Sequence, residues 1–439
     1  MKIRLPFCLI VACLILTGTL HAQDAQLLTI KDAVEIALKN NYNIKLSQNN
    51  AAIAKNNVTP GAAGMLPKVT GQFTSSNSIQ NTTQTRSDNT VNVINNANNT
   101  GTNYGANLNW TIFDGFNMFA SYKGLKERNA LGQVLLRDTV QATLANVLAS
   151  YYDLVNQNEL LNSLKGAMAI SHLQLRYAND KFKVGRVSKL DVLNAEVNYN
   201  TDTASYITQR QQYKTSQIRL NQILIRDLQT DFKVADTIVV DQKLVLGDIL
   251  NQAQGQNPAI LASQINQRLA EISFKQIQST RYPQVNVNSG YTVSNNKTPA
   301  GFAQVQKTNG ISYGLTATIN IFDGFNQWRR ERNAKLQMNN AGINYDQTKL
   351  SINSQVSTLY VGYLTGLDLI KLGQSNVTIA KRNLDISLEK YKIGNITPLE
   401  IREAQRNYLD AQAKFFSAQY QSKIAEITLK QITATVDIQ

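Results

Sequence analysis

The stretch IFDGFN occupies residues 112–117, and the same six residues return at 321–326, 209 positions further along the chain. A second pair of segments has the same offset: KVGRVSKLDVLNAEVNY begins at Lys183, and KIGNITPLEIREAQRNY begins at Lys392. Two matches at one offset indicate an internal duplication. The fold can therefore be read as one structural unit that occurs twice.

The duplication divides the chain into a first repeat at 23–230, a linker at 231–245 and a second repeat at 246–439. Upstream of IFDGFN, LTIKDAVEIALKNNYNI resembles LVLGDILNQAQGQNPAI, and Pro67 aligns with Pro283. Between this proline and IFDGFN the first copy carries seven extra residues. Because insertions of this size are tolerated best in surface loops, we expect the extra residues in a loop.

Residues 1–22, MKIRLPFCLIVACLILTGTLHA, have the basic start, apolar run and small-residue end of a secretory signal peptide. A lipoprotein cleavage at Cys13 is a second possibility, and the sequence leaves it open. Both cysteines lie in this segment, so ordinary cleavage removes them and no disulfide framework is expected. No other stretch approaches the roughly 18 apolar residues of a membrane helix. Entry into a membrane would therefore require β-strands.

Two stretches alternate apolar and polar residues over about ten positions, which is the pattern of membrane β-strands. They lie near 102–113 and 310–322, and each leads into an IFDGFN segment. Their partner strands are predicted near 67–80 and 283–294, and the polar stretches between partners are expected to be loops. A soluble sheet with one face exposed to solvent has the same alternation, so a soluble sandwich is the alternative interpretation. Four strands among long helices are too few for a sandwich, which favours the membrane interpretation.

IFDGFN is predicted to be the junction at which a strand becomes a helix. Asp114-Gly115 and Asp323-Gly324 are turn residues, and each glycine permits a positive φ. A phosphate-binding loop is the alternative, but a single glycine with no following Lys-Ser or Lys-Thr supports it only weakly.

Very long helices follow these junctions, because no proline occurs at 68–257 or at 300–397. Apolar residues recur at helical spacing from residue 117 to 183, and a helix of that length spans about 100 Å. Such helices fit a bundle or a tube better than a compact domain.

The second duplicated segment predicts a helix-turn-helix tip in each repeat, at 185–188 and 394–397. Each copy has a glycine suited to the end of a helix, a Ser or Thr N-cap three residues later, and an acidic residue that completes a capping box. These residues are Gly185, Ser188 and Asp191 in the first copy and Gly394, Thr397 and Glu400 in the second. Pro398 occupies the first helical position, where proline is favoured.

The formal net charge of +14 does not predict nucleic-acid binding, because Lys and Arg are spread along helices and no nucleic-acid-binding motif occurs. His172 is the one histidine outside the signal segment, and it lies in mid-helix. We therefore expect no catalytic residue, no metal site and no cofactor, and an outer-membrane lipase is disfavoured.

A duplicated unit of a strand pair and a helical hairpin resembles the TolC-type outer-membrane efflux protein family. The resemblance spans nearly all of the chain after the signal segment, and VGRVSKLDVLNAE and IGNITPLEIREAQ carry it most specifically. It implies a mainly α fold with membrane β: three copies, each with four strands, complete a trimeric 12-stranded β-barrel that an α-helical barrel continues into the periplasm.

The family role implies a passive exit channel in the cell outer membrane, not an enzyme. Its partners would be two further copies of the chain, outer-membrane lipid, a periplasmic adaptor (membrane fusion) protein and an inner-membrane transporter. Drug efflux, cation efflux and type I secretion share this duct, so the substrate stays open. A coiled-coil stalk or adhesin with a membrane anchor is the alternative function.

In the family, the two helical turns form the periplasmic entrance and meet the adaptor. The contact residues carried over are Val184, Gly185, Ser188, Ile393, Gly394 and Thr397. Gate carboxylates map to Glu400 and Glu403, and a closing link between hairpins maps to Asp191 and Tyr391. Helix capping alone also accounts for Asp191 and Glu400. A basic gate residue of the family is replaced here by Ile396, which leaves an ion-pair lock at that position open.

Overall fold

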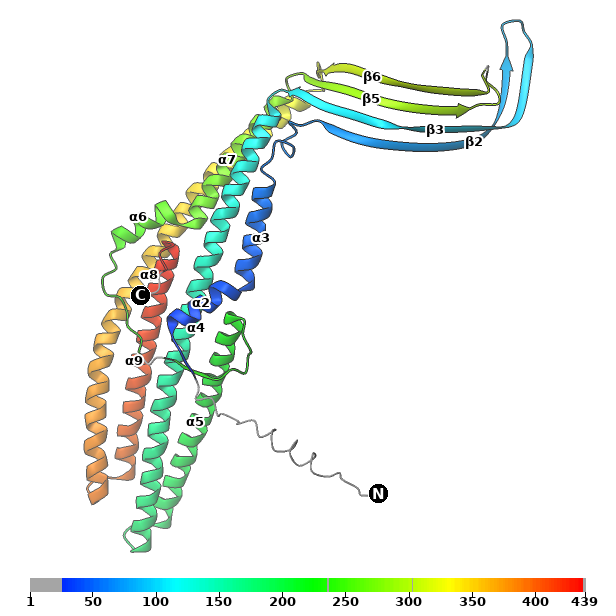
Figure 1. Ribbon diagram of the computed structural model, residues 1–439. Coiled ribbons are helices and arrows are strands. Elements are labelled where there is room, and N and C mark those ends of the chain that lie inside the picture. Colours follow the sequence, from blue (N-terminus) through cyan, green and yellow to red (C-terminus); the bar gives the residue numbers. More distant parts are fainter. Residues whose placement is uncertain (1–25, 235–236, 302, 437–439) are drawn as a thin grey trace, which may run out of the picture.

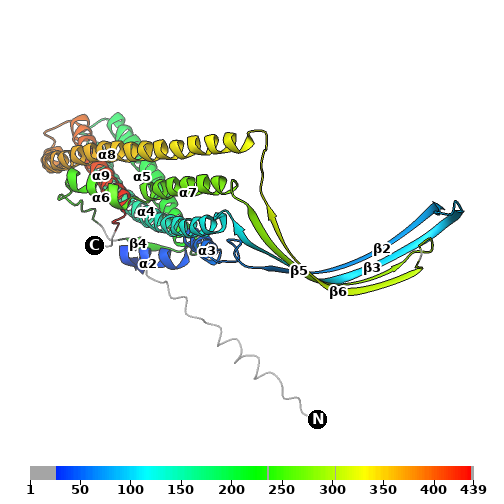
Figure 2. The same cartoon turned by 90° about the horizontal axis from the view of Figure 1, so that it is seen from above.

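The computed structural model describes residues 26–234, 237–301 and 303–436. The predicted signal peptide at 1–22, including Cys13, lies outside the described residues. A bundle of long helices makes up most of the molecule, and a four-stranded sheet extends from one end of it (Figures 1 and 2). No described helix has an apolar stretch long enough to cross a membrane.

The two repeats have the same order of elements, two helices, two strands and two helices. The first comprises α2 (Ile30–Asn40), α3 (Tyr42–Asn56), β2 (Lys68–Thr85), β3 (Val91–Asp114), α4 (Asn117–Lys183) and α5 (Lys189–Leu224). The second comprises α6 (Leu246–Gln256), α7 (Pro258–Ser279), β5 (Gln284–Lys297), β6 (Val305–Thr318), α8 (Asn326–Ile393) and α9 (Pro398–Ile432). The same order of six elements thus occurs twice in the chain.

α4 and α8 have 67 and 68 residues, so each spans about 100 Å, as the absence of proline predicts. Figure 1 shows α4 near the middle of the bundle. Next to the sheet, α4 packs against α3 and α7, and α7 packs against α8. Toward the far end, α4 packs against α5 and α9, and α9 packs against α8. One edge of the bundle is therefore formed by α3 and α5, and the other by α8.

The sheet is antiparallel, with the strand order β2-β3-β5-β6, so β2 and β6 are its edges. The predicted loop between the first two strands is wrong in extent, because the strands continue to a short turn at 86–90. Polar residues pair here as well as apolar ones, since ladder hydrogen bonds come from the backbone. The register shifts between Gln80 and Thr82, and Figure 1 shows the tip of this hairpin turned away from the sheet.

The predicted end of the last strand is also wrong: β6 stops at Thr318, and 319–325 are not strand. Thr318 pairs with Gln284, the first residue of β5, so the following residues have no partner strand within the chain. Alternation in the sequence continues through Ile321 and does not reveal this end.

The first IFDGFN segment joins β3 directly to α4, whereas the second begins after the end of β6 and leads into α8. Gly115 and Gly324 have φ values of 68° and 66°, and a Cβ on Gly115 would lie 2.2 Å from the Ser279 carbonyl oxygen. The Asp114 carboxylate accepts a hydrogen bond of 3.0 Å from the backbone N–H of Met118 in the first turn of α4. Asp323 instead pairs with Arg330 at 3.4 Å.

A left-handed phenylalanine follows each glycine, which the sequence did not predict. Phe116 and Phe325 have φ values of 71° and 62°, in a region that non-glycine residues seldom occupy. The ring of Phe116 packs edge-on against Phe113, and that of Phe325 packs in the same way against Phe322.

The described parts of the predicted linker at 231–245 contact other elements of the chain. Two short strands, β1 (Gln26–Leu28) and β4 (Phe232–Val234), pair in parallel. Further along, the Tyr360 hydroxyl donates a 3.1 Å hydrogen bond to the Leu244 carbonyl oxygen, and buried Glu426 accepts one of 3.0 Å from the backbone N–H of Asp241. Asp241 and Leu244 are thereby held against α9 and α8.

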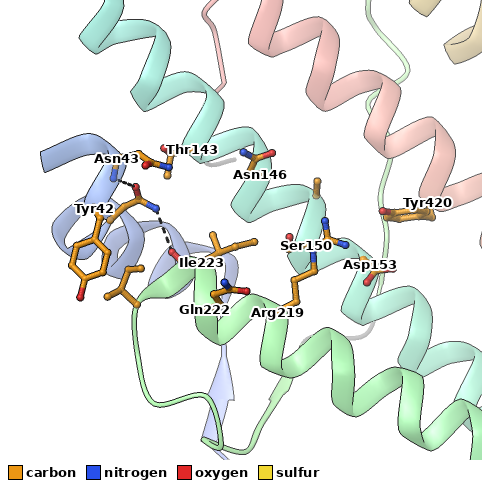
Figure 3. Close-up of a pocket in the computed structure, with 13 residues that line it drawn as sticks. Tyr42, Asn43, Thr143, Asn146, Ser150, Asp153, Arg219, Gln222, Ile223 and Tyr420 are labelled. Atoms are coloured by element: carbon orange, nitrogen blue, oxygen red, sulfur yellow. Dashed lines mark hydrogen bonds between the residues drawn. The ribbon is translucent and has the colours of Figure 1, made fainter. Parts of the chain in front are cut away.

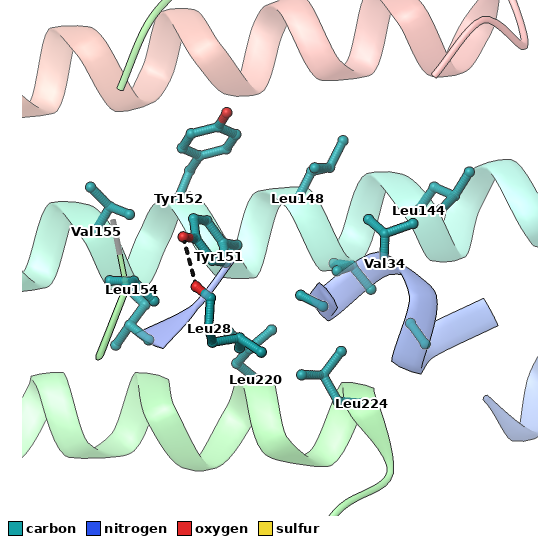
Figure 4. Close-up of a cluster of buried hydrophobic side chains, with 14 of the residues drawn as sticks. Leu28, Val34, Leu144, Leu148, Tyr151, Tyr152, Leu154, Val155, Leu220 and Leu224 are labelled. Carbon is teal, nitrogen blue, oxygen red and sulfur yellow. Dashed lines mark hydrogen bonds between the residues drawn. The ribbon is translucent and has the colours of Figure 1, made fainter. Parts of the chain in front are cut away.

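An apolar core surrounds this connection near the middle of the bundle (Figure 4). Leu28 and Val34 pack there against Leu154 on α4 and Leu220 on α5. The buried Tyr151 hydroxyl donates a 3.0 Å hydrogen bond to the Leu28 carbonyl oxygen, which satisfies both polar groups. The core thus seats β1 and α2 on the helical bundle.

Two glycines one turn apart on α8 give a test of this packing. A Cβ on Gly366 would lie 2.0 Å from Ser422 Oγ and 3.0 Å from Ser422 Cβ, whereas a Cβ on Gly362 would meet nothing within 4 Å. We expect Gly366→Ala to lower the free energy of unfolding by about 1–3 kcal/mol through overpacking. Gly362→Ala should be neutral or stabilising by up to about 1 kcal/mol. Thermal unfolding followed by circular dichroism measures both, and equal midpoints for the two variants would contradict the α8–α9 packing.

Candidate functional site

The candidate site is the pair of turns at the end of the bundle farthest from the sheet (Figure 1). In the first, Gly185 has a φ of 72°, and the N–H of Arg186 donates to the Lys181 carbonyl oxygen at 2.9 Å. Ser188 and Asp191 then form the predicted capping box: Ser188 Oγ accepts from the Asp191 N–H at 3.2 Å, and Asp191 Oδ2 accepts from the Ser188 N–H at 2.9 Å.

The second turn has the same construction. Gly394 has a φ of 83°, and the N–H of Asn395 donates to the Lys390 carbonyl oxygen at 2.8 Å. The Thr397 N–H donates to Glu400 Oε2 at 3.0 Å, and Thr397 Oγ1 accepts from the Glu400 N–H at 3.3 Å. Both capping boxes predicted from the sequence are therefore present, with Pro398 beginning α9.

Tyr391 is buried between the two hairpins, with 5% of its surface exposed. Lys181 Nζ donates to the Tyr391 carbonyl oxygen at 3.0 Å and lies 4.6 Å from the centroid of the Tyr391 ring. Burial, together with the nearby Asp191 carboxylate, raises the pKa of Tyr391. Asp191 accepts its described hydrogen bonds from Ser188, and none joins it to the Tyr391 hydroxyl. The described link between these hairpins at Tyr391 is thus made by Lys181.

The other predicted residues of the tip are accessible. Val184, Gly185, Ser188, Ile393, Gly394 and Thr397 are all exposed, with Val184 and Ile393 at 69% and 77%. Glu400 and Glu403 are also exposed, and no hydrogen bond or ion pair between described residues joins either of them to Asp191 or Tyr391. Ile396 is half-buried.

The sequence interpretation missed a buried polar cluster above the turns. Asp202 on α5 and Arg402 on α9 form a two-pronged ion pair, which Ser171 and Gln405 join. The sequence does contain one indication that Asp202 is buried. It lies in a series with alternating steps of three and four residues, which is the spacing of a packed helix face. The series is Val192, Ala195, Tyr199, Asp202, Tyr206 and Gln209. A carboxylate on such a face indicates a buried partner.

A separate hollow of about 500 Å³ lies at the middle of the bundle, where α2 and α3 meet α4 and α5 (Figure 3). Asp153 and Arg219 are the charged residues among those that line it. Asp153 accepts hydrogen bonds from Ser216 Oγ at 2.7 Å and from Gln157 Nε2 at 3.2 Å. No residue predicted as functional lines this hollow.

Comparison with known proteins decides the family. The family model described as outer membrane efflux protein matches residues 33–224 and 249–435, which is most of both repeats. The chain belongs to the outer membrane efflux protein family. As a family member it resides in the outer membrane, extends into the periplasm and takes part in efflux. A stalk or adhesin is not favoured.

Characterised outer membrane proteins are similar to this chain over long alignments. The outer membrane efflux protein BepC of Brucella suis biovar 1 (strain 1330) is 23% identical over 428 residues, which cover 97% of this chain and 90% of BepC. The outer membrane protein TolC of Escherichia coli (strain K12) is 22% identical over 325 residues, covering 72% of this chain and 66% of TolC.

Solved structures show the same fold. The CmeC outer membrane channel of Campylobacter jejuni superimposes with a TM-score of 0.78 at 19% identity, covering 92% of this chain and 85% of CmeC. The open state of the MtrE outer membrane channel of Neisseria gonorrhoeae gives 0.69 at 15% identity, covering 92% of this chain and 88% of MtrE.

The cap at the first turn should depend on pH. Hydrogen bonds from the Ser188 side chain and backbone lower the pKa of Asp191 below its usual value. The stabilisation is therefore fully present above the unfolded pKa of about 3.9 and is lost as the pH falls through the lower folded value. Hydrogen–deuterium exchange of the first turn of α5 should accelerate relative to the α5 interior only below about pH 3.9. Asp191→Asn should abolish this pH dependence, and an equal dependence in that variant would refute the assignment.

Proposed function

We propose that three copies of this chain close into one passive exit channel, in which a 12-stranded barrel is continued by a tube of helices. The observation that carries this proposal is the pair of unpaired sheet edges, β2 and β6. Lipid tolerates no open edge, because each unsatisfied backbone group costs several kcal/mol. Four strands are also fewer than the eight of the smallest single-chain bacterial barrels.

The edges of the bundle support the same closure. Exposed Leu and Ile residues recur along α8, mostly every seven positions. They are Leu336, Ile343, Leu350, Leu364, Leu372, Ile379, Ile386 and Ile393. The opposite edge, α5, exposes Leu190, Leu193, Val197 and Ile207 at steps typical of a helix–helix seam.

These two edges fit each other when one copy meets the next. β2, α3 and α5 lie on one side of the chain, whereas β6 and α8 lie on the other (Figure 1). Joining unlike edges is a head-to-tail contact, which produces a ring when the rotation closes. Strand edge and helix edge would then be covered by the same neighbour.

The far tip is the proposed entrance. The exposed residues Val184, Gly185, Ser188, Ile393, Gly394 and Thr397 would dock a periplasmic adaptor, which connects the channel to an inner-membrane transporter. The relatives are outer membrane efflux and TolC proteins, and the extension of this chain into the periplasm supports a similar role. Transport through the duct requires no catalytic group in this chain.

The proposed gate lies at the same tip. Three-fold symmetry would bring three copies each of Glu400 and Glu403 around one axis, where like charges repel and cations bind. Tyr391 and Asp191 would hold the hairpins together when the tip is shut, with Lys181 completing the link through the Tyr391 carbonyl oxygen.

The trimer is tested by one substitution on the α8 stripe. Leu350 is 70% exposed in a single chain, so a charge there is tolerated by the chain but not by a helical neighbour. We expect purified wild-type protein in detergent to have the mass of a trimer, and Leu350→Asp to weaken the trimer at least about tenfold, in line with burying an unpaired charge. The control is Lys349→Asp, which lies about 100° around the helix. A wild-type monomer with full strand content would sink the proposal.

The gate is tested by removing charge without removing the caps. Glu400→Gln together with Glu403→Gln keeps a capping-box side chain at 400, since Gln serves there as Glu does. We expect divalent cations to block wild-type single channels in planar bilayers and to lose about tenfold or more of that block in the double variant. Glu389→Gln, which removes an exposed carboxylate on α8 that pairs with Lys392, is the control. Unchanged block in the double variant would place the cation site elsewhere.

A further inference from the structure

A buried polar cluster joins the two helical hairpins of the chain above their turns. Arg402 Nη1 and Nη2 donate to the two carboxylate oxygens of Asp202 at 2.6 and 2.8 Å. Ser171 on α4 also donates its hydroxyl to Asp202. The cluster therefore connects α9 of the second hairpin with both helices of the first.

Gln405 completes this cluster. Its Nε2 lies 3.0 Å from Asp202 Oδ2, 3.1 Å from Ser171 Oγ and 3.0 Å from the Ala167 carbonyl oxygen. Its Oε1 accepts a hydrogen bond of 3.3 Å from Gln174. Every member has at least one partner from the other hairpin or from the neighbouring helix, as a buried network requires.

The ion pair and its two neighbours are largely buried. The Asp202 and Arg402 side chains are 7% and 18% exposed, and Ser171 and Gln405 are each 1% exposed. A buried pair contributes little compared with well-packed apolar side chains, but removal of one member leaves the other charge unpaired in the interior. Loss of either member alone should therefore destabilise the closed arrangement of the hairpins, in which the remaining charge stays buried.

No other ion pair between described residues joins the α4–α5 hairpin to the α8–α9 hairpin. Arg402 is in the second turn of α9, which begins at Pro398, so it lies directly behind the second periplasmic turn. Asp202 lies 13 residues into α5, about 20 Å from the first turn. The second turn is thus fixed against the side of the first hairpin.

We infer that Asp202 and Arg402 form a latch that positions the second hairpin in the closed channel. When the tip opens, the second hairpin moves away from α4 and α5, the two Arg402 hydrogen bonds break and water enters to solvate both charges. The latch rests on the proposed channel function, but it assigns the closing contact to residues outside the turns. Gln405 and Ser171 are positioning residues that orient the Asp202 carboxylate toward Arg402.

The test compares loss of one charge with loss of both, in full-length trimers reconstituted in planar bilayers. Asp202→Leu and Arg402→Met should each raise the open probability at least about tenfold, because each leaves one unpaired charge. The double variant, which leaves no unpaired charge but also no contact between the hairpins, should open less often than either single variant and more often than wild type. Arg402→Lys, which keeps the charge but not the two-pronged geometry, should be intermediate. Arg406→Met, which removes an exposed arginine one turn further along α9, is the matched control.

A second measurement does not depend on conductance. Spin labels on Arg186→Cys and Asn395→Cys report the separation of the two turns, and the only natural cysteines are Cys8 and Cys13. The single-charge variants should lengthen this separation most, and the double variant should lengthen it less. Folded trimeric single variants with wild-type separation and wild-type open probability would overturn the latch. Should wild-type and variant proteins all fail to conduct while the separations change as expected, the channel proposal fails and the hairpin contact stands.

Discussion

Unpaired backbone groups along β2 and β6 are the constraint on which the rest of the architecture depends. A four-stranded sheet at the outer membrane leaves a row of N–H and C=O groups on each edge, and lipid offers them no hydrogen bonds. In the proposed trimer the partner strand comes from another chain, and the helices that continue from the strands then meet the same neighbour. β6 leads into α8, so the edge of the sheet and the edge of the bundle lie on the same side of the chain. The exposed apolar residues of α8 lie on this side.

In the proposed trimer the duplication satisfies this constraint, because the β2–β3 hairpin of one copy supplies the strand edge that the β5–β6 hairpin of the next copy requires. The two halves have diverged where their surroundings differ. β3 is covered on both sides by strands of its own chain and runs to Asp114, whereas β6 is covered on one side and ends at Thr318. The IFDGFN sequence is identical in both halves. The Asp114 carboxylate nevertheless accepts a hydrogen bond from the first turn of α4, whereas Asp323 forms an ion pair with Arg330.

Local features could be predicted from the sequence, and contacts between distant segments could not. The turns at Gly185 and Gly394 depend on residues within one helical turn, so spacing alone identifies their caps. The ends of β2 and β6 depend on where a partner strand begins, which side-chain alternation does not encode. Asp202 has a visible signal on its helix face, but its partner Arg402 is 200 residues away and resembles any exposed arginine. Left-handed Phe116 and Phe325 follow from no local preference at all.

The spacing of the exposed stripe on α8 also determines how the helix winds. A stripe repeated every seven residues drifts by about 20° per repeat on a straight helix, which favours a left-handed supercoil. Between Leu364 and Leu372 the step is eight residues. This single step turns the stripe about 80° in the opposite direction and offsets the drift of about four heptads. In the proposed trimer α8 can therefore keep one side toward a neighbour over its whole length while remaining nearly straight, so that the wall of the proposed tube needs little superhelical twist.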